Sequence, residues 1–177
     1  MNTLRRALRI VDGINLWAGR LTKYLIAALM LLMVYEVITR YVLNSPSIWA
    51  LESSQFLFCG VIALSGGWAL LRGKHVNVGI LRDRLGIRPG AVLDVAATPL
   101  FFLFVIAFLG QSLIPMVKGF ADLEKSGTYW NPPIYPIYAV IFVGAVLILL
   151  QGIAQTVRSI TTAVTGKAGK ELLDRIE

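Results

Sequence analysis

Residues that usually carry protein chemistry are scarce in this chain. It has one histidine (His75), one cysteine (Cys59) and only 15% charged residues. A single cysteine excludes an intramolecular disulfide, and one histidine with one cysteine excludes a metal or haem site built from such ligands of this chain alone. The sequence also lacks a glycine-rich phosphate loop and a Ser-His-Asp or Cys-His set. We therefore expect neither an enzyme nor a bound cofactor.

Long apolar runs dominate what is present. Hydrophobic residues make up 56% of the chain and its mean hydropathy is +0.71. Four stretches are nearly free of charge and have the roughly 20 residues needed to cross about 30 Å of hydrocarbon. This pattern predicts an all-α membrane protein with a four-helix transmembrane domain over residues 21–156. Its spans are expected at about 21–43, 51–71, 91–117 and 134–156.

The positive charge is grouped in a way that predicts the orientation of these spans. The chain has 17 Lys and Arg against 10 Asp and Glu, a net charge of +7. Most basic residues fall within 5–23, 72–88 and 158–175, and these clusters alternate with two poorer loops. The positive-inside rule then places both termini and the middle loop in the cytoplasm. The charge is explained by topology, so nucleic acid is not an expected partner.

The two ends of the chain differ from the spans. In residues 1–20, apolar side chains recur at helical spacing opposite Arg5, Arg9 and Asp12, which predicts an amphipathic helix at the cytoplasmic membrane surface. Residues 157–177 are expected to form a cytoplasmic tail. A signal peptide is the competing interpretation of the N-terminus, but no small-residue cleavage site follows the first run.

Charge, proline and aromatic residues concentrate in the stretch from Glu36 to Glu52, between the first two runs. Glu36 and Arg40 stand four apart in the favourable order for an intrahelical pair. They could neutralise each other, pair with another helix or subunit, or form a proton or coupling-ion site. Asn44 and Pro46 are typical of a turn, with Pro46 suited to the first position of a helix. Trp49 fits an interfacial aromatic belt.

Small residues mark one face of the second span. Cys59, Ala63 and Gly67 recur every four residues, a spacing that lets helix backbones approach closely. We expect this face to pack against another helix. His75 lies in the basic middle loop, where a capping or headgroup contact is its ordinary role.

The order and spacing of these features resemble a known family. The pattern Arg40-Tyr41-Val-x-Asn44-x-Pro46-x-x-Trp49-x-x-Glu52, followed by Arg72 and His75, is similar to the small integral-membrane (DctQ-type) subunit of tripartite ATP-independent periplasmic (TRAP) transporters. The resemblance covers nearly the whole chain. It departs at Asn77, where many members carry an acidic residue.

The resemblance implies a secondary transport system in the bacterial inner membrane. A periplasmic binding protein (DctP-type) would deliver an organic acid, a large multi-span permease (DctM-type) would carry it with an ion gradient, and the small subunit would pack against the permease within the lipid. The candidate subunit-contact or structural residues are Glu36, Arg40, Tyr41, Asn44, Pro46, Trp49, Glu52, Arg72 and His75. Two alternatives stay open: a stand-alone proton-coupled exporter that uses Glu36, and an anchor subunit of another complex.

Overall fold

Four long helices make up the described part of the chain. The computed structural model describes residues 2–72 and 87–165. The helices are α1 (Asn2–Tyr41), α2 (Ala50–Leu71), α4 (Ile87–Ala121) and α5 (Tyr135–Thr165). Each is long and apolar enough to cross a membrane. The prediction of an all-α protein with four spans is confirmed. His75 and residues 166–177 of the expected tail lie outside the described residues.

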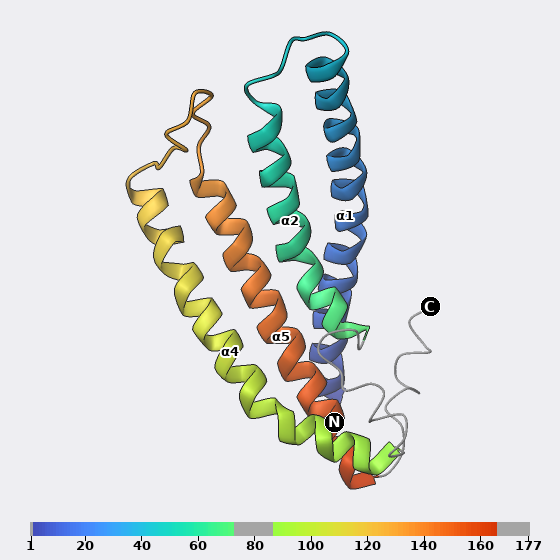
Figure 1. Cartoon of the computed structure of the whole chain (residues 1–177). Coiled ribbons are helices and arrows are strands. Elements are labelled where there is room, and N and C mark those ends of the chain that lie inside the picture. The colour runs from blue at the N-terminus through green and yellow to red at the C-terminus, as the bar shows by residue number, and fades with distance from the viewer. Residues whose placement is uncertain (1, 73–86, 166–177) are drawn as a thin grey trace.

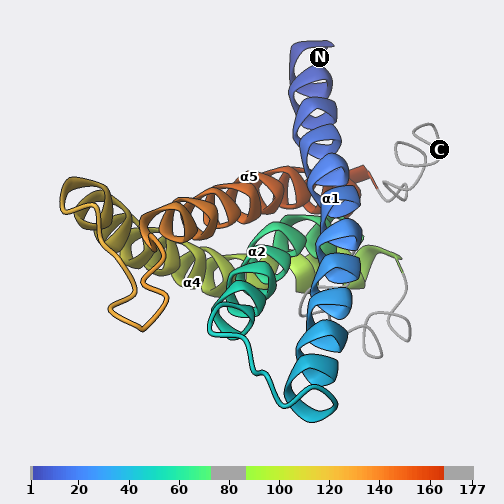
Figure 2. The same cartoon turned by 90° about the horizontal axis from the view of Figure 1, so that it is seen from above.

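The helices form an open row in the order α1, α2, α5, α4, not a closed bundle (Figure 1). Helix α4 packs along α5, α5 packs along α2, and α2 packs along α1. Viewed from above, α1 slants across the C-terminal end of α5, where a smaller α1–α5 contact forms (Figure 2). Within the described ranges α4 contacts neither α1 nor α2. The two outer helices therefore bury only one side each.

The helix ends differ from the expected spans. Helix α1 has 40 residues, about 60 Å at the helical rise and twice the thickness of the hydrocarbon. It shows no break at residue 20, so the expected surface segment and first span share one helix. Whether residues 1–20 lie at the membrane surface stays a prediction. Helices α4 and α5 begin or end several residues beyond their predicted spans.

The expectation that a helix starts at Pro46 is wrong. Residues 45–47 have no regular secondary structure, and α2 begins at Ala50 with Trp49 as its N-cap residue. Asn44 adopts a positive φ of 48°, a left-handed conformation that asparagine tolerates better than most residues. The Ser47 side chain bonds back to α1, and this contact ties the linker to the end of α1 where a helical turn was predicted.

Small residues allow α5 to pack closely at the centre of the row. A Cβ built on Gly144 of α5 would lie 2.5 Å from the backbone oxygen of Ala63 in α2. On its other side, Gly152 lies directly under the ring of Phe101 from α4. Ala145 and Val105 are fully buried beside these contacts. Because no side chain separates the α2 and α5 backbones at Gly144, dispersion contacts there replace the hydrophobic effect, which is absent between helices in lipid.

The loop between α4 and α5 is an ordered turn. Residues Lys125 and Pro133 form an isolated antiparallel bridge, and the Asn131 side chain accepts a hydrogen bond from the backbone N–H of Gly127 at 3.1 Å. This frame projects Tyr129, which is 96% exposed. It lies at the same end of the molecule as the α1–α2 turn (Figure 1).

Candidate functional site: polar clusters at the two ends of the helices

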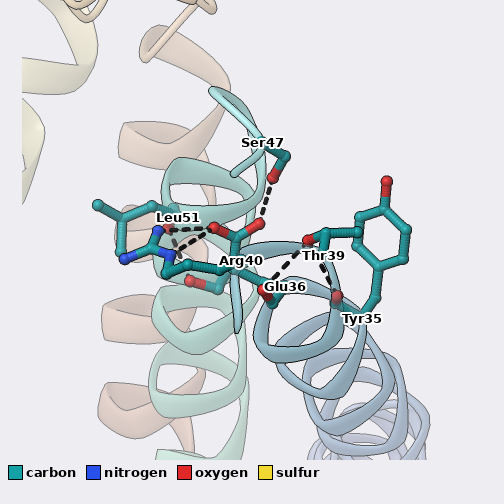
Figure 3. A network of polar contacts seen from close by, with 7 residues as sticks. Tyr35, Glu36, Thr39, Arg40, Ser47 and Leu51 are labelled. Atoms are coloured by element: carbon teal, nitrogen blue, oxygen red, sulfur yellow. Dashed lines mark hydrogen bonds and ion pairs between the residues drawn. The ribbon is translucent and has the colours of Figure 1, made fainter. Parts of the chain in front are cut away.

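The first polar cluster, which we call the outer cluster, consists of Glu36, Arg40 and Ser47 at the α1–α2 turn (Figure 3). Arg40 donates from Nε and Nη2 to Oε1 of Glu36, at 3.0 and 2.6 Å. The Ser47 hydroxyl donates to the other carboxylate oxygen. Glu36 thus joins the last turns of α1 to the linker that follows. Both of its oxygens accept hydrogen bonds from the chain itself, as in a structural pair.

The surroundings of the outer cluster fix the same turn. The Tyr35 and Trp49 rings stack with centroids 5.7 Å apart, a contact between α1 and the residue that starts α2. Thr39 is buried and donates to the backbone oxygens of Tyr35 and Glu36 at 3.1 Å. Aromatic stacking contributes about 0.5–1.5 kcal/mol beyond the area that the rings bury. The turn is therefore held by charge, hydrogen bonds and ring contact together.

The other residues predicted for this site are distributed unevenly. Tyr41, Asn44 and Pro46 lie in or beside the turn and are exposed. Glu52 lies in the first turn of α2, where a helix N-terminus favours negative charge. Its Oε2 atom is buried and has no hydrogen-bond partner among the described residues.

Arg72 follows the C-terminal end of α2, on the opposite side of the membrane span from the outer cluster. Its guanidinium lies 5.9 Å from the centroid of the Trp68 ring. The structure therefore does not bring Arg72 to the other predicted residues. Where His75 lies relative to them falls outside the described residues.

A second polar cluster, the inner cluster, was missed by the sequence analysis. It consists of Asp12 and Asn15 from α1 with Gln151 and Arg158 from α5. Gln151 donates to Asp12 at 3.1 Å and accepts a hydrogen bond from Asn15 at 2.9 Å, while Arg158 forms an ion pair with Asp12. Asp12 is 2% exposed, whereas the prediction placed it on the water-facing side of an amphipathic helix. That prediction is wrong because Asp12 has a cationic partner on another helix.

The inner cluster also depends on a glycine in α2. A Cβ at Gly67 would collide with the Asn15 side-chain amide and approach the backbone oxygen of Leu147 to 3.3 Å. Three helices therefore meet at this point. Asn15 Oδ1 and Arg158 Nη1 are buried without a hydrogen-bond partner among the described residues. In the apolar run of α5, Gln151 was the available signal, since a polar side chain inside a span usually has a specific partner.

The predicted packing face of α2 lies partly in these contacts. Ala63 meets Gly144, and Gly67 meets Asn15 and Leu147. Gly66, beside this face, lies against the flexible end of Ile148. Cys59 is partly buried and free, and it lies one turn further toward the outer end. Its role as a packing residue stays a prediction.

Comparison with known proteins assigns this chain to a family. The open row of four spans, with one polar cluster near each end of the helices, defines a multi-pass membrane protein. The family model described as "Tripartite ATP-independent periplasmic transporters, DctQ component" matches residues 29–162. That match covers most of the chain, and the chain belongs to this family. The family consists of transporter subunits and not of enzymes, and its members are multi-pass proteins of the inner membrane.

Two curated relatives from Vibrio cholerae serotype O1 are similar to part of the chain. The sialic acid TRAP transporter small permease protein SiaQ is 32% identical over 92 residues, which are 51% of this chain and 53% of SiaQ. The C4-dicarboxylate TRAP transporter small permease protein DctQ is 26% identical over 112 residues, 63% of this chain and 42% of that protein. The chain thus matches about half the length of these relatives.

Proposed function

We propose that this chain is the small scaffold subunit of a TRAP-type secondary transporter. It packs against a large DctM-type permease, which takes up an organic acid with an ion gradient after a DctP-type periplasmic binding protein has delivered it. Both curated relatives carry the name of a carboxylic acid, sialic acid or a C4-dicarboxylate. Membership of the family and these names support an organic acid as the substrate class.

The open row of helices is the observation that carries the proposal. A closed bundle would bury the inward faces of all four helices, but here only 6% of the most apolar window of α1 and 11% of that of α4 are buried. For the central helices, the buried share of the same window is 28% in α2 and 33% in α5. An open row with so little interior offers long apolar faces to another membrane subunit, and small residues along α2 and α5 show how closely its helices can pack.

The position of the polar groups argues against transport by this chain alone. Stand-alone secondary transporters bind their cargo near the midplane, usually where helices are broken. Each helix here is unbroken over its described length. The two clusters lie near opposite ends of the helices and not midway along them. Glu36, the proton site of the exporter alternative, has both carboxylate oxygens engaged by Arg40 and Ser47. The family also does not favour this alternative.

Orientation follows from the charge pattern. With the basic ends of the chain in the cytoplasm, the outer cluster and the ordered α4–α5 loop face the periplasm. Arg40, Trp49 and Glu52 then occupy the periplasmic edge of the row. Arg40 is 45% exposed despite its ion pair, and Trp49 is 37% exposed. Glu52 is half-buried, and its Oε2 atom has no hydrogen-bond partner within residues 2–72 and 87–165. We infer that these three side chains contact the permease.

Co-purification tests this contact. Tagged chains are expressed with the permease, extracted in mild detergent, and the permease recovered per tag is measured. Arg40→Ala and Glu52→Ala should each reduce recovery several-fold, whereas Arg6→Ala, which removes a charge at the other end of α1, should not. Equal recovery and equal substrate uptake in all four strains would remove these residues from the interface. If a strain that lacks the gene for this chain still grew on the substrate, the proposed function itself would be wrong.

A further inference from the structure

One polar side chain lies exposed within an apolar span. Between Asp94 and Lys118, helix α4 holds three polar residues, Thr98, Gln111 and Ser112. Thr98 and Ser112 donate their hydroxyls to backbone oxygens of α4 itself, at 3.0 and 2.9 Å. Gln111 is exposed, and its side-chain amide forms no hydrogen bond with the described residues. Its donor and acceptor groups are therefore available to another molecule.

The depth of Gln111 in the span requires such a partner. Lys118 lies in the last turn of α4, and Gln111 lies about 10 Å deeper at the helical rise. A lysine extends its ammonium group to the headgroups, but a glutamine side chain is too short to cover that distance. Lipid chains offer no hydrogen bond at this depth, and a polar group inside a span usually has a specific partner. The partner of Gln111 is therefore expected on another membrane helix.

Gln111 borders a face of α4 that the chain leaves uncovered. Helix α4 is the last of the row (Figure 1), and Val105, Ser112 and Gly119 are buried against α5, the one helix that it contacts within the described ranges. Away from α5, exposed residues recur at alternating spacings of three and four, along which helices pack in a left-handed crossing. These residues, which we call the α4 stripe, are Leu100, Leu103, Ala107, Gly110, Ile114 and Val117.

Gly110 shows that the α4 stripe admits a close neighbour. Every glycine of α2 and α5 has an atom of an adjacent helix within 4 Å of the place where its Cβ would lie, as at Gly144 and Gly152. A Cβ at Gly110 would meet nothing within 4 Å. Ala107, one turn away, is also small and exposed. Small residues at such positions let two helix backbones approach closely.

A second copy of this chain does not supply the missing partner. Two copies with the same topology would join along the α4 stripe as parallel helices, and Gln111 would then hold the flanking position that faces position 106 of the other copy. That residue is Ile106, which is 60% exposed and has no side-chain hydrogen-bonding group. A different helix, with its own polar side chain opposite Gln111, satisfies the amide.

We propose that the α4 stripe docks one transmembrane helix of the large permease, and that Gln111 forms an interhelical hydrogen bond with a polar side chain of that helix. The identity of this partner rests on the proposed function. The stripe adds a contact within the lipid to the one at the periplasmic edge. Neighbouring helices lie about 8–10 Å apart, so α2 and α4, separated by α5, are about 20 Å apart, and a multi-span permease is wide enough to meet both.

Titration of the permease onto the tagged full chain in mild detergent tests the proposal. Gln111→Leu, which removes the amide and keeps the side-chain bulk, should raise the apparent dissociation constant about three- to tenfold, equivalent to about 0.6–1.4 kcal/mol. Gly110→Leu, which fills the α4 stripe, should raise it at least as much. Gly13→Leu is the matched control, because Gly13 of α1 also has open space where its Cβ would lie, and it should leave the constant unchanged.

Two further measurements separate docking from folding and identify the occupant. Gln111 is exposed and Gly110 faces open space, so neither α4 variant should lower the melting temperature of the purified chain alone. A benzoylphenylalanine photo-cross-linker placed at Ile114, on the α4 stripe, should join the chain to the permease.

Other results would overturn the proposal. They are an unchanged dissociation constant in both α4 variants, an equal increase in Gly13→Leu, a cross-link between two copies of the chain, or no cross-link to any protein. The proposed function can fail separately. If the unaltered chain did not bind the permease, that function would be wrong and the stripe would lose its partner. If the chain bound and neither α4 variant changed the constant, the docking surface alone would be wrong.

Discussion

The ion pair between Asp12 and Arg158 provides the sharpest test of how α1 is held to the row. Asp12 is 2% exposed and the Arg158 side chain 13%. Removing one partner of a buried pair leaves an uncompensated charge, which costs about 3–5 kcal/mol. The cluster lies near the inner end of α5, where partial solvation of Arg158 lowers the cost. We therefore expect Asp12→Ala and Arg158→Ala each to lower the free energy of unfolding by about 3 kcal/mol.

A double variant separates the pair from its packing. Asp12→Leu with Arg158→Met removes both charges and keeps side chains of useful volume, and such replacements of buried ion pairs are often neutral. Gln151 then loses one acceptor, which costs about 1–3 kcal/mol if the amide stays unsatisfied. The double variant should therefore be at least as stable as either alanine variant, so its loss should be at least about 3 kcal/mol smaller than the sum of the two alanine losses.

The assay is denaturant unfolding in detergent, followed by circular dichroism, with Arg6→Ala as the control for loss of an exposed charge on α1. That control should change stability by less than about 0.5 kcal/mol. If the single variants also fall within this range, or if their effects simply add, the inner cluster does not hold α1 and the reasoning from its burial is refuted.

Further predictions concern packing, the outer turn and orientation. Gly144→Ala, whose new methyl would press on the Ala63 backbone, should destabilise the protein by about 1–3 kcal/mol. Gly110→Ala, whose methyl meets open space, should not. Equal melting temperatures for the two variants would contradict the close α2–α5 contact. Ser47→Ala removes a hydrogen bond to a carboxylate and should cost about 1.5–3 kcal/mol by the same unfolding assay, while no loss would mean that the linker is held by the ring stack alone. In a Cys59→Ala background, a membrane-impermeant maleimide should label Tyr129→Cys in spheroplasts and Arg6→Cys only after lysis; the reverse pattern would invert the proposed orientation.

The sequence predicted the parts of this fold that depend on local patterns. Charge-free length predicted the four spans. The four-residue spacing of Glu36 and Arg40 allowed an intrahelical pair but left a partner on another helix or an ion site open, and the structure contains the intrahelical pair. The order of the helices in the row could not be predicted. In lipid, an apolar side chain is accommodated on the packed and on the exposed face alike, so periodicity does not identify the neighbour of each helix.

The inner cluster shows a second limit. Asp12 and Gln151 are 139 positions apart, and the sequence around neither residue indicates that the other is its partner. The polar face of residues 1–20 was instead attributed to water, which is the ordinary surrounding of such a face. Gln151, alone in an apolar run, should have prompted a search for a polar partner on another helix.

The central claim is that this chain is one subunit of a larger membrane transporter. The most direct test is purification of the tagged chain from its native membranes in mild detergent, with mass spectrometry to identify and quantify what accompanies it. The account predicts one large multi-span permease in a stoichiometric amount. A homogeneous oligomer of this chain with no permease would contradict it, and Glu36 would then be the residue to test for transport by this chain alone.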